Sequence, residues 1–197
     1  REALRQAEVV FHLGAHFAWG LSLEHSRAVN VEGAKRVALL AAELNSRLVM
    51  IGGYMLNNHE HLQRIGIDPR QPELTNWPAV YRRVGGYEAS KLEAHFATQQ
   101  VMSAKGGEMT VVHPATVCGH SRTGHILDGQ PLVALICNLV QGKMTAVPGT
   151  AEHWLPLVTV DYLVELVAVC AFDPAMVGQE LLALDDQTPN LRELLAQ

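Results

Sequence analysis

A tyrosine and a lysine stand four residues apart in segment 85–91, Gly-Gly-Tyr-Glu-Ala-Ser-Lys, which opens a run with helical pattern. At ~3.6 residues per turn, this spacing places Tyr87 and Lys91 on one helix face, about one turn apart. A free phenol titrates near ~10 and transfers its proton poorly at neutral pH. A neighbouring ammonium group lowers that pKa. The pair therefore predicts a general acid or base, although the same spacing also occurs on solvated helix faces.

Composition narrows the classes of protein to consider. The 197 residues suffice for one large core. With 15 basic and 20 acidic residues, the net charge of −5 disfavours nucleic acid and anionic membrane as partners. No apolar run approaches the ~20 residues of a membrane span, and residues 1–7 resemble no targeting peptide, so a cytoplasmic protein is expected. Cys118, Cys137 and Cys170 are widely spaced in apolar surroundings, which predicts buried thiols and no disulfide or zinc site.

Apolar periodicity places the Tyr-Lys pair within alternating strands and helices. Strands are predicted at 8–13, 47–51, 109–113, 145–148, 157–160 and 180–184, and helices at 29–44, 87–103, 132–140, 162–171 and from about 189. This alternation predicts an α/β fold with a parallel sheet. Asp161 is expected to cap its helix. The proline-containing stretch 54–84 is expected to be a long irregular loop, and such loops are commonly functional.

Several of these segments together resemble a known enzyme superfamily. They are residues 10–15 (Val-Phe-His-Leu-Gly-Ala), 30–33 (Asn-Val-Glu-Gly), the Tyr-Lys pair and 112–119 (Val-His-Pro-Ala-Thr-Val-Cys-Gly). They resemble the extended short-chain dehydrogenase/reductases of the NAD-dependent epimerase/dehydratase superfamily. Segments 119–124 and 155–162 look most like its thioester-reductase and fatty-acyl-reductase branch. The resemblance implies a Rossmann-like, doubly wound parallel sheet that binds NAD or NADP.

The resemblance also implies roles for individual residues. Tyr87 matches the catalytic acid/base, Lys91 the lysine that lowers its pKa, and Asn30 the asparagine that kinks its helix and supports a proton-relay water. The residues expected along the cofactor are Gly14, Ala15, Pro114, Ala115, Thr116 and Val117, besides Tyr87 and Lys91. Ligands of open parallel sheets bind at the carboxyl ends of the strands, where these segments fall.

Two positions depart from the family pattern. Gly53 stands where a Ser or Thr should bond the substrate carbonyl, so Tyr54 or a water substitutes, or activity is lost. His113 stands where the family usually has Arg before Pro, which weakens a charge role there. Gly53, Tyr54, His16, Trp19 and Trp154 are the candidate substrate-pocket residues.

The glycine-rich turn that cradles a cofactor pyrophosphate does not occur in this sequence. By resemblance, the sheet is expected to lack its first strands, in a fragment or the ordered part of a longer protein. Residues 1–120 are then a partial NAD(P)-binding domain, and 121–197 a small substrate-binding region interleaved with the last Rossmann elements. The residue that distinguishes NAD from NADP belongs to the part of the family pattern that this sequence lacks, so the sequence does not decide between the two cofactors.

Other chemistries fit the sequence less well. His59-Glu60-His61 lacks the spacing that places both imidazoles on one helix face, so no metal site is predicted. Ser121, Asp161 and His153 have the residue types of a hydrolase triad but no Gly-x-Ser-x-Gly elbow. The predicted function is that of an NAD(P)-dependent oxidoreductase acting on a small-molecule carbonyl, alcohol or acyl-thioester-derived substrate. A homodimer is compatible with this prediction. Alternatives are a non-catalytic NAD(P)-binding or sensing protein and a sugar-nucleotide epimerase or dehydratase.

Overall fold

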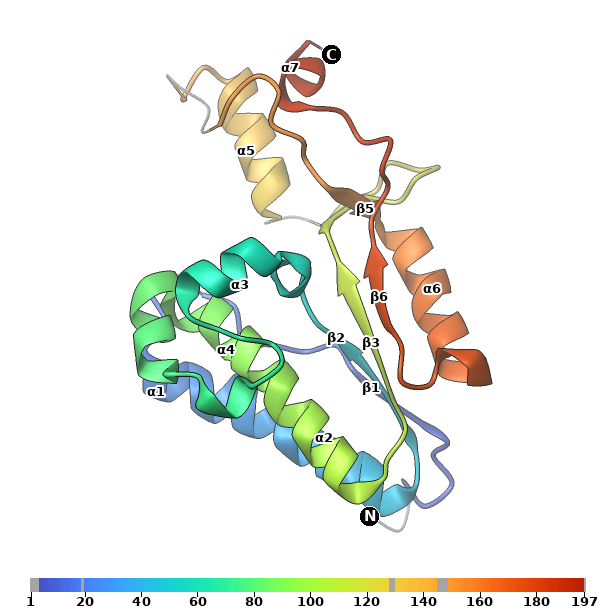
Figure 1. Cartoon of the computed structure of the whole chain (residues 1–197). Coiled ribbons are helices and arrows are strands. Elements are labelled where there is room, and N and C mark those ends of the chain that lie inside the picture. The colour runs from blue at the N-terminus through green and yellow to red at the C-terminus, as the bar shows by residue number, and fades with distance from the viewer. Residues whose placement is uncertain (1–3, 19, 128–129, 145–148, 197) are drawn as a thin grey trace. The chain divides into compact units, whose positions relative to one another are not determined.

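A four-stranded sheet forms where the sequence predicts most of its buried strands (Figure 1). The computed structural model describes residues 4–18, 20–127, 130–144 and 149–196. The strands are β1 (Val9–His12), β2 (Arg47–Ile51), β3 (Met109–Pro114) and β6 (Glu180–Ala183), in the order β1-β2-β3-β6. β1 pairs with β2, and β2 with β3, in parallel. The predicted parallel α/β sheet is therefore confirmed, and the carboxyl ends of these strands share one edge.

One continuous helical run packs on a face of this sheet. It consists of α1 (Leu23–Ser26), a π-helical turn (Arg27–Val31) and α2 (Glu32–Leu44). The helix predicted from residue 29 thus begins earlier, and Val29 itself is exposed. The buried side chains are small ones, among them Ala38 and Ala41, which pack with Leu48 of β2 and Met102. Small residues let the helix axis lie close to its neighbours, which explains why alanines occupy this face.

The stretch 54–84 is mostly helical, so the prediction of an irregular loop is wrong. It contains two short 3₁₀ turns (Tyr54–Asn57 and Pro72–Leu74), α3 (His59–Ile65) and the start of α4 (Trp77–Lys105). Asn58 and Asn76 cap α3 and α4 with their side chains. Pro72 and Pro78 lie in the first turns of their helices, where proline needs no N–H partner. Their presence marks helix starts here rather than a loop.

The chain divides into two compact units, residues 1–113 with 167–182 and residues 114–166 with 183–197. In the second unit, β4 (Thr116–Cys118) pairs in parallel with β5 (Leu157–Thr159). Its helices are α5 (Pro131–Val140) and α7 (Leu191–Leu195), and α6 (Val160–Phe172) begins in it. The predicted strand at 145–148 and Trp19 lie outside the described residues. The assignment of the cofactor to residues 1–120 and of the substrate to residues 121–197 stays a prediction.

Two further expectations about single residues are wrong. Asp161 lies inside α6 instead of capping it, and its carboxylate accepts hydrogen bonds from Ser121 N at 2.9 Å and Ser121 Oγ at 2.6 Å. Of the cysteines, Cys170 is buried, Cys118 is half-buried and Cys137 is exposed, so the prediction of buried thiols fails at Cys137. This cysteine lies on α5, within an apolar segment that periodicity alone cannot orient.

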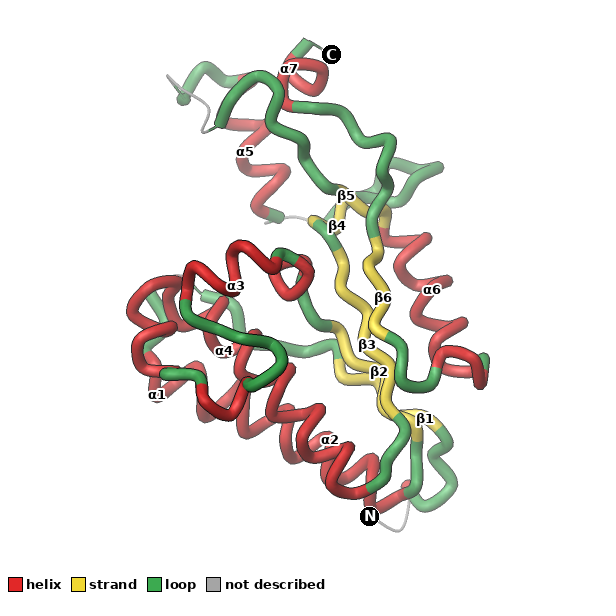
Figure 2. Tube along the Cα trace, in the orientation of Figure 1, coloured by secondary structure: helices red, strands yellow, loops and turns green. Residues whose placement is uncertain are grey.

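The end of α6 is fastened to the start of β2. Arg47 donates from its guanidinium to the carbonyls of Cys170, Ala171 and Asp173, the last at 2.8 Å. Figure 2 shows these last turns of α6 on the side of the sheet opposite α2 and α4. Helices on both faces are the arrangement expected of a doubly wound sheet.

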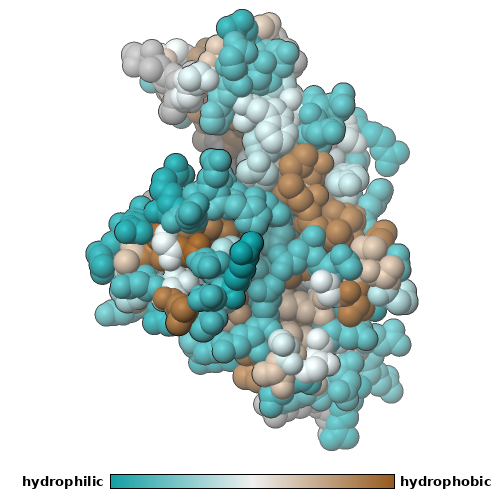
Figure 3. Space-filling model, viewed as in Figure 1, coloured by the Kyte–Doolittle hydropathy of each residue, from teal (hydrophilic) through white to brown (hydrophobic). Residues whose placement is uncertain are grey.

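Apolar side chains remain exposed along α6, including Val164 at 62% and Phe172 at 71% exposure. Figure 3 shows hydrophobic atoms gathered over α6 and β6 on the face in view. Among the described helices, none combines the length and the apolar character that a membrane crossing requires.

Candidate active site

The helix that carries Tyr87 begins at a kink within α4. Gly85 has φ 81° and ψ 169°, which divides α4 into two helical parts. Backbone at this φ strongly favours glycine. At Gly86, a Cβ would lie 2.3 Å from Leu21 O, so a larger residue would displace that backbone. The glycine pair therefore fixes where the second helical part starts, directly before Tyr87.

Lys91 is buried one turn further along this helix, at 8% exposure. Its Nζ donates to Ile51 O at 2.8 Å, at the carboxyl end of β2. Burial lowers the pKa of Lys91 to about 8. The lysine thus anchors α4 to the edge of the sheet where the predicted active site lies. Among the residues that the structure describes, no carboxylate pairs with its ammonium group.

Tyr87 is half-buried, and its ring packs edge-on against Phe17, with ring centroids 4.7 Å apart. Burial raises the pKa of Tyr87 above its usual value. The sequence pattern predicts the opposite direction, because it assumes that the Lys91 ammonium group acts on the phenol. In the structure that ammonium group hydrogen-bonds to Ile51 O instead. Tyr87 is therefore protonated at neutral pH.

Asn30 joins the loop after β1 to the Tyr87 helix. It lies buried in the π-helical turn, 4% exposed, which agrees with the predicted kink. Its Oδ1 accepts from His16 N at 2.7 Å, and its Nδ2 donates to His16 O at 3.2 Å and to Ser90 Oγ at 2.8 Å. Ser90 Oγ in turn donates to Tyr87 O at 2.9 Å. One amide side chain thus holds both segments that carry predicted site residues.

The loop after β1 presents an open surface. Gly14 and Ala15 are exposed, and no atom lies within 4 Å of the place where a Cβ would stand on Gly14. His16, a predicted pocket residue, is also exposed, and its Nδ1 lies 3.0 Å from His25 Nε2. Because Asn30 fixes the backbone of His16, this loop has a defined course beside the end of β1.

The turn after β2 is packed against His113. A Cβ on Gly52 would lie 2.3 Å from His113 Nδ1, so this position has no room for a side chain. Gly53 N donates to the same Nδ1 at 3.3 Å. On Gly53, an added Cβ would instead meet the flexible Met55 side chain, with Sδ at 2.3 Å. The turn thus offers no hydroxyl at Gly53, as the sequence indicates.

Sequence reasoning missed the partners of this turn. His113 Nε2 lies 2.9 Å from Glu180 Oε2, and His113 is 1% exposed. The expectation that a histidine here only weakens a charge role does not include this pair of a buried histidine with an exposed glutamate. His95 also escaped notice, although it follows Lys91 by four residues and so lies on the same helix face. Tyr54 opens a 3₁₀ turn and is half-buried.

The remaining predicted residues belong to the second unit. Ala115 N donates to Ala183 O at 2.9 Å, and Thr116 N donates to Pro156 O at 3.1 Å. Trp154 is 38% exposed and forms an isolated bridge with Asn190. Pro114 and Val117 flank these positions in the same unit. Within that unit, the segment 114–117 is therefore extended, and its place beside the cofactor stays a prediction.

The rejected alternatives gain no support from the geometry. His61 Nε2 lies 2.5 Å from Glu88 Oε1, so it forms a surface pair between α3 and α4. Ser121 donates directly to Asp161, whereas a hydrolase triad places the histidine between serine and acid. No contact of the His153 side chain with either residue is found among the described residues.

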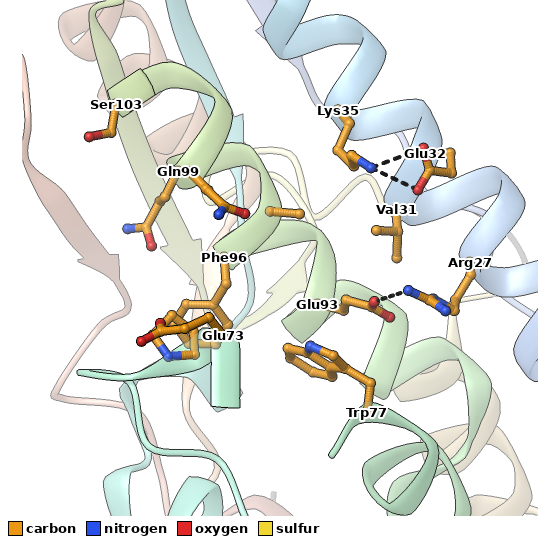
Figure 4. Close-up of a pocket in the computed structure, with 13 residues that line it drawn as sticks. Arg27, Val31, Glu32, Lys35, Glu73, Trp77, Glu93, Phe96, Gln99 and Ser103 are labelled. Carbon is orange, nitrogen blue, oxygen red and sulfur yellow. Dashed lines mark hydrogen bonds and ion pairs between the residues drawn. The ribbon is translucent and has the colours of Figure 1, made fainter. Parts of the chain in front are cut away.

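A pocket of about 430 Å³ lies beside α4 (Figure 4). It is lined by the π-helical turn, α2, α4 and the Pro72 turn, and not by Tyr87, Lys91 or Asn30. Two ion pairs lie in it, Arg27 with Glu93 at 2.6 Å and Lys35 with Glu32 at 3.0 Å. Because none of the predicted site residues lines this pocket, it is not the candidate site.

Solved structures share this fold. The terminal R domain from the myxalamid PKS-NRPS biosynthetic pathway superposes with a TM-score of 0.73 at 23% identity, covering 99% of this chain and 47% of that one. A short-chain dehydrogenase/reductase superfamily protein from Agrobacterium tumefaciens with bound NAD gives 0.66 at 16% identity, covering 99% and 66%. A UDP-glucuronic acid 4-epimerase from Bacillus cereus in complex with NAD gives 0.69 at 13%, covering 99% and 60%.

At these identities the similarity shows the fold alone, and the chain spans about half the length of the R domain, 47%. No curated protein matches the sequence significantly. A profile of NAD-binding domains described as Male sterility protein matches residues 1–167. This match covers most of the chain and agrees with the parallel sheet and with the extended short-chain dehydrogenase/reductase resemblance. The chain therefore belongs to the Male sterility protein family of NAD-binding domains.

Proposed function

We propose that this chain carries the acid/base part of an NAD(P)-dependent oxidoreductase that reduces a carbonyl or acyl-thioester-derived substrate. The observation that supports it most is the way Tyr87 is held. Its helix is tied to the loop after β1 through Asn30 and Ser90, and to the end of β2 through Lys91. The phenol thus belongs to a segment fixed at the edge of the sheet where parallel folds bind ligands.

The residues present fit one end of the cofactor. Gly14 leaves open space beside the exposed loop after β1, where a flat ring can approach the backbone. We assign no residue to the pyrophosphate, because the sequence has no glycine-rich turn. When bound, the nicotinamide supplies or accepts hydride. We infer no preference for NAD or NADP.

The raised pKa of Tyr87 favours the reductive direction. A phenol that is protonated at neutral pH can donate its proton to the substrate oxygen as the carbonyl is reduced. The Lys91 ammonium group, with a pKa of about 8, is mostly charged at pH 7 and follows the tyrosine by one helical turn. Phe17 packs edge-on against the Tyr87 ring. The resemblance of segments 119–124 and 155–162 to thioester reductases supports acyl thioesters as the first substrates to assay.

A second candidate is a non-catalytic NAD(P)-binding or sensing protein. Gly53 supports it, because a carbonyl that gains negative charge usually needs a donor besides the tyrosine, and glycine has no side chain to provide one. Gly53 N is also occupied by His113. The same fold and residues further allow an epimerase or dehydratase reaction on a sugar nucleotide.

The first prediction separates these candidates. In the full-length protein, Tyr87→Phe should lower turnover by ~10²–10⁴-fold, the usual contribution of acid/base catalysis, and leave cofactor affinity nearly unchanged. Turnover is measured with NADPH and NADH on a panel of acyl thioesters, aldehydes, ketones and sugar nucleotides. Tyr162→Phe, at an exposed tyrosine of α6, is the matched control and should behave as wild type.

Each other outcome has a defined meaning. Turnover of Tyr87→Phe within about threefold of wild type would reject Tyr87 as the acid/base. No turnover by wild type on any substrate, together with measurable NAD(P)H binding, would favour the sensing protein.

A further inference from the structure

Two buried histidines and a glutamate meet beneath the turn after β2. His95 comes from α4, His113 from the end of β3, and Glu180 from the start of β6. Their side chains are 3%, 1% and 42% exposed. One donor atom from each lies within 4.8 Å of the others. Among the residues that the structure describes, no second group of this kind occurs.

His95 is poorly satisfied for a buried polar side chain. Its Nδ1 is buried without a hydrogen-bond partner. Its Nε2 lies 3.7 Å from Glu180 Oε1, which is beyond hydrogen-bonding distance. Buried polar atoms without partners cost free energy, and of these two nitrogens it is Nε2 that faces the Glu180 carboxylate. Burial also lowers the pKa of His95 to about 4, which leaves the ring neutral and able to donate a lone pair at neutral pH.

We propose that His95, His113 and Glu180 bind a divalent transition metal ion, for which Zn²⁺ is the best chemical match. Two imidazoles and one carboxylate are a common ligand set for zinc sites that keep one position open. The two carboxylate oxygens face different histidines: Oε2 lies 2.9 Å from His113 Nε2, and Oε1 lies 3.7 Å from His95 Nε2. One ligand atom from each of the three residues lies within 4.8 Å of the other two, which is close enough for a single ion to contact all three.

The surroundings support such a site. The side chain of Gln99 donates to Glu180 Oε1 and so orients the carboxylate, as second-shell groups do in metal sites. Glu180 is also the partly exposed member of the group, which gives an ion a way in. The sequence predicts no metal site, because these residues are far apart along the chain and only the pairing of strands brings them together.

Metal binding should affect the turn at Gly53. Gly53 N–H donates to His113 Nδ1, so this nitrogen carries the lone pair and Nε2 carries the proton. An ion bound at Nε2 displaces that proton, which moves to Nδ1. Two N–H groups then face each other at 3.3 Å, and the bond from Gly53 is lost. Metal binding at His113 and the hydrogen bond that holds the turn at Gly53 therefore exclude one another.

The test uses the full-length protein after removal of metals by a chelator. Isothermal titration with Zn²⁺ should show one ion per chain, and Co²⁺ should give the visible absorption of a site with nitrogen and oxygen ligands. Loss of an outer-shell partner alone typically weakens metal affinity ~10–100-fold, so His95→Ala and Glu180→Gln should each weaken Zn²⁺ binding at least ~10-fold. His59→Ala/His61→Ala, in the histidine pair of α3, is the matched control and should retain binding.

No saturable binding, or equal affinity in wild type and Glu180→Gln, would overturn the site. Glu180→Gln decides the question if His95→Ala does not fold, because it keeps the shape of a partly exposed side chain. The effect on the turn rests on the proposed function: Zn²⁺ should lower turnover of wild type and not of Glu180→Gln. Binding without this inhibition would support the site and overturn its effect on Gly53.

Discussion

Lys91 keeps an ammonium group in a buried position, where the structure gives it a hydrogen bond to Ile51 O. Burial disfavours the charged form, and this is why the pKa falls from 10.5 to about 8. A protein that needed only a stable helix at this place would use an apolar side chain. The cost of the buried charge therefore supports a functional role for Lys91, because functional sites are where such perturbed groups concentrate.

This cost predicts how stability depends on pH. Between pH ~8 and ~10.5 the unfolded chain keeps the Lys91 proton that the native state has lost, so stability rises with pH through this window. Below it, both states are charged and the full cost remains. Lys91→Met should therefore be more stable than wild type at pH 7, by about 1–2 kcal/mol after the lost hydrogen bond is counted.

Urea unfolding of both proteins at pH 7 and pH 10 measures the effect. The advantage of Lys91→Met should shrink toward zero at the higher pH, and Lys105→Met, at the exposed end of α4, should show no such dependence. A difference that stays constant with pH would mean that the lysine is not buried as the structure shows.

The elements of the site differ in how well the sequence predicts them. β2 was predicted at its observed bounds, because a short apolar run ends at the pair Gly52-Gly53. The Tyr-Lys helix was predictable for the same local reason, its spacing and the glycines before it. The stretch 54–84 was not predictable in this way, because proline is typical both of loops and of the first turn of a helix.

The His113–Glu180 pair could not be predicted from any local pattern, because 67 residues separate its members and the sheet order brings them together. The pKa of Tyr87 was predicted in the wrong direction for a similar reason. Spacing on a helix shows which side chains share a face, but not which carbonyl a lysine reaches. Long-range contacts set both the electrostatics of the tyrosine and the partners of the turn.

Asn30 carries a prediction at the scale of elements, since it joins the loop after β1 to α4. Asn30→Ala removes its hydrogen bonds to His16 N, His16 O and Ser90 Oγ. Leaving buried groups unpaired typically costs ~1–3 kcal/mol, so the free energy of unfolding should fall by about this amount. Exchange of backbone amides in residues 13–17 should also accelerate.

Denaturant unfolding and hydrogen exchange measure the two effects. Asn138→Ala, at an exposed asparagine of α5, is the control. Unchanged exchange at 13–17 would show that the loop holds its course without Asn30.

At the scale of the whole molecule, the sheet and the second unit carry different parts of the predicted site. The loop after β1 and the Tyr87 helix belong to the first unit, and the segment 114–117 and Trp154 to the second. Parallel sheets bind ligands at the carboxyl ends of their strands, so the first unit and the segment after β3 are expected to contact the cofactor. The proposed substrate region is 121–197.

Hydrogen exchange on the full-length protein tests this assignment, because bound ligands protect the backbone amides that they cover. NADPH or NADH should slow exchange in residues 13–17 and 114–118. A non-reacting acyl thioester, added with cofactor to Tyr87→Phe, should then slow exchange within 121–166. Residues 59–65 of α3 serve as an internal control and should not change. Cofactor protection confined to 121–197 would reverse the assignment of the two regions, and it would place the nicotinamide away from Tyr87.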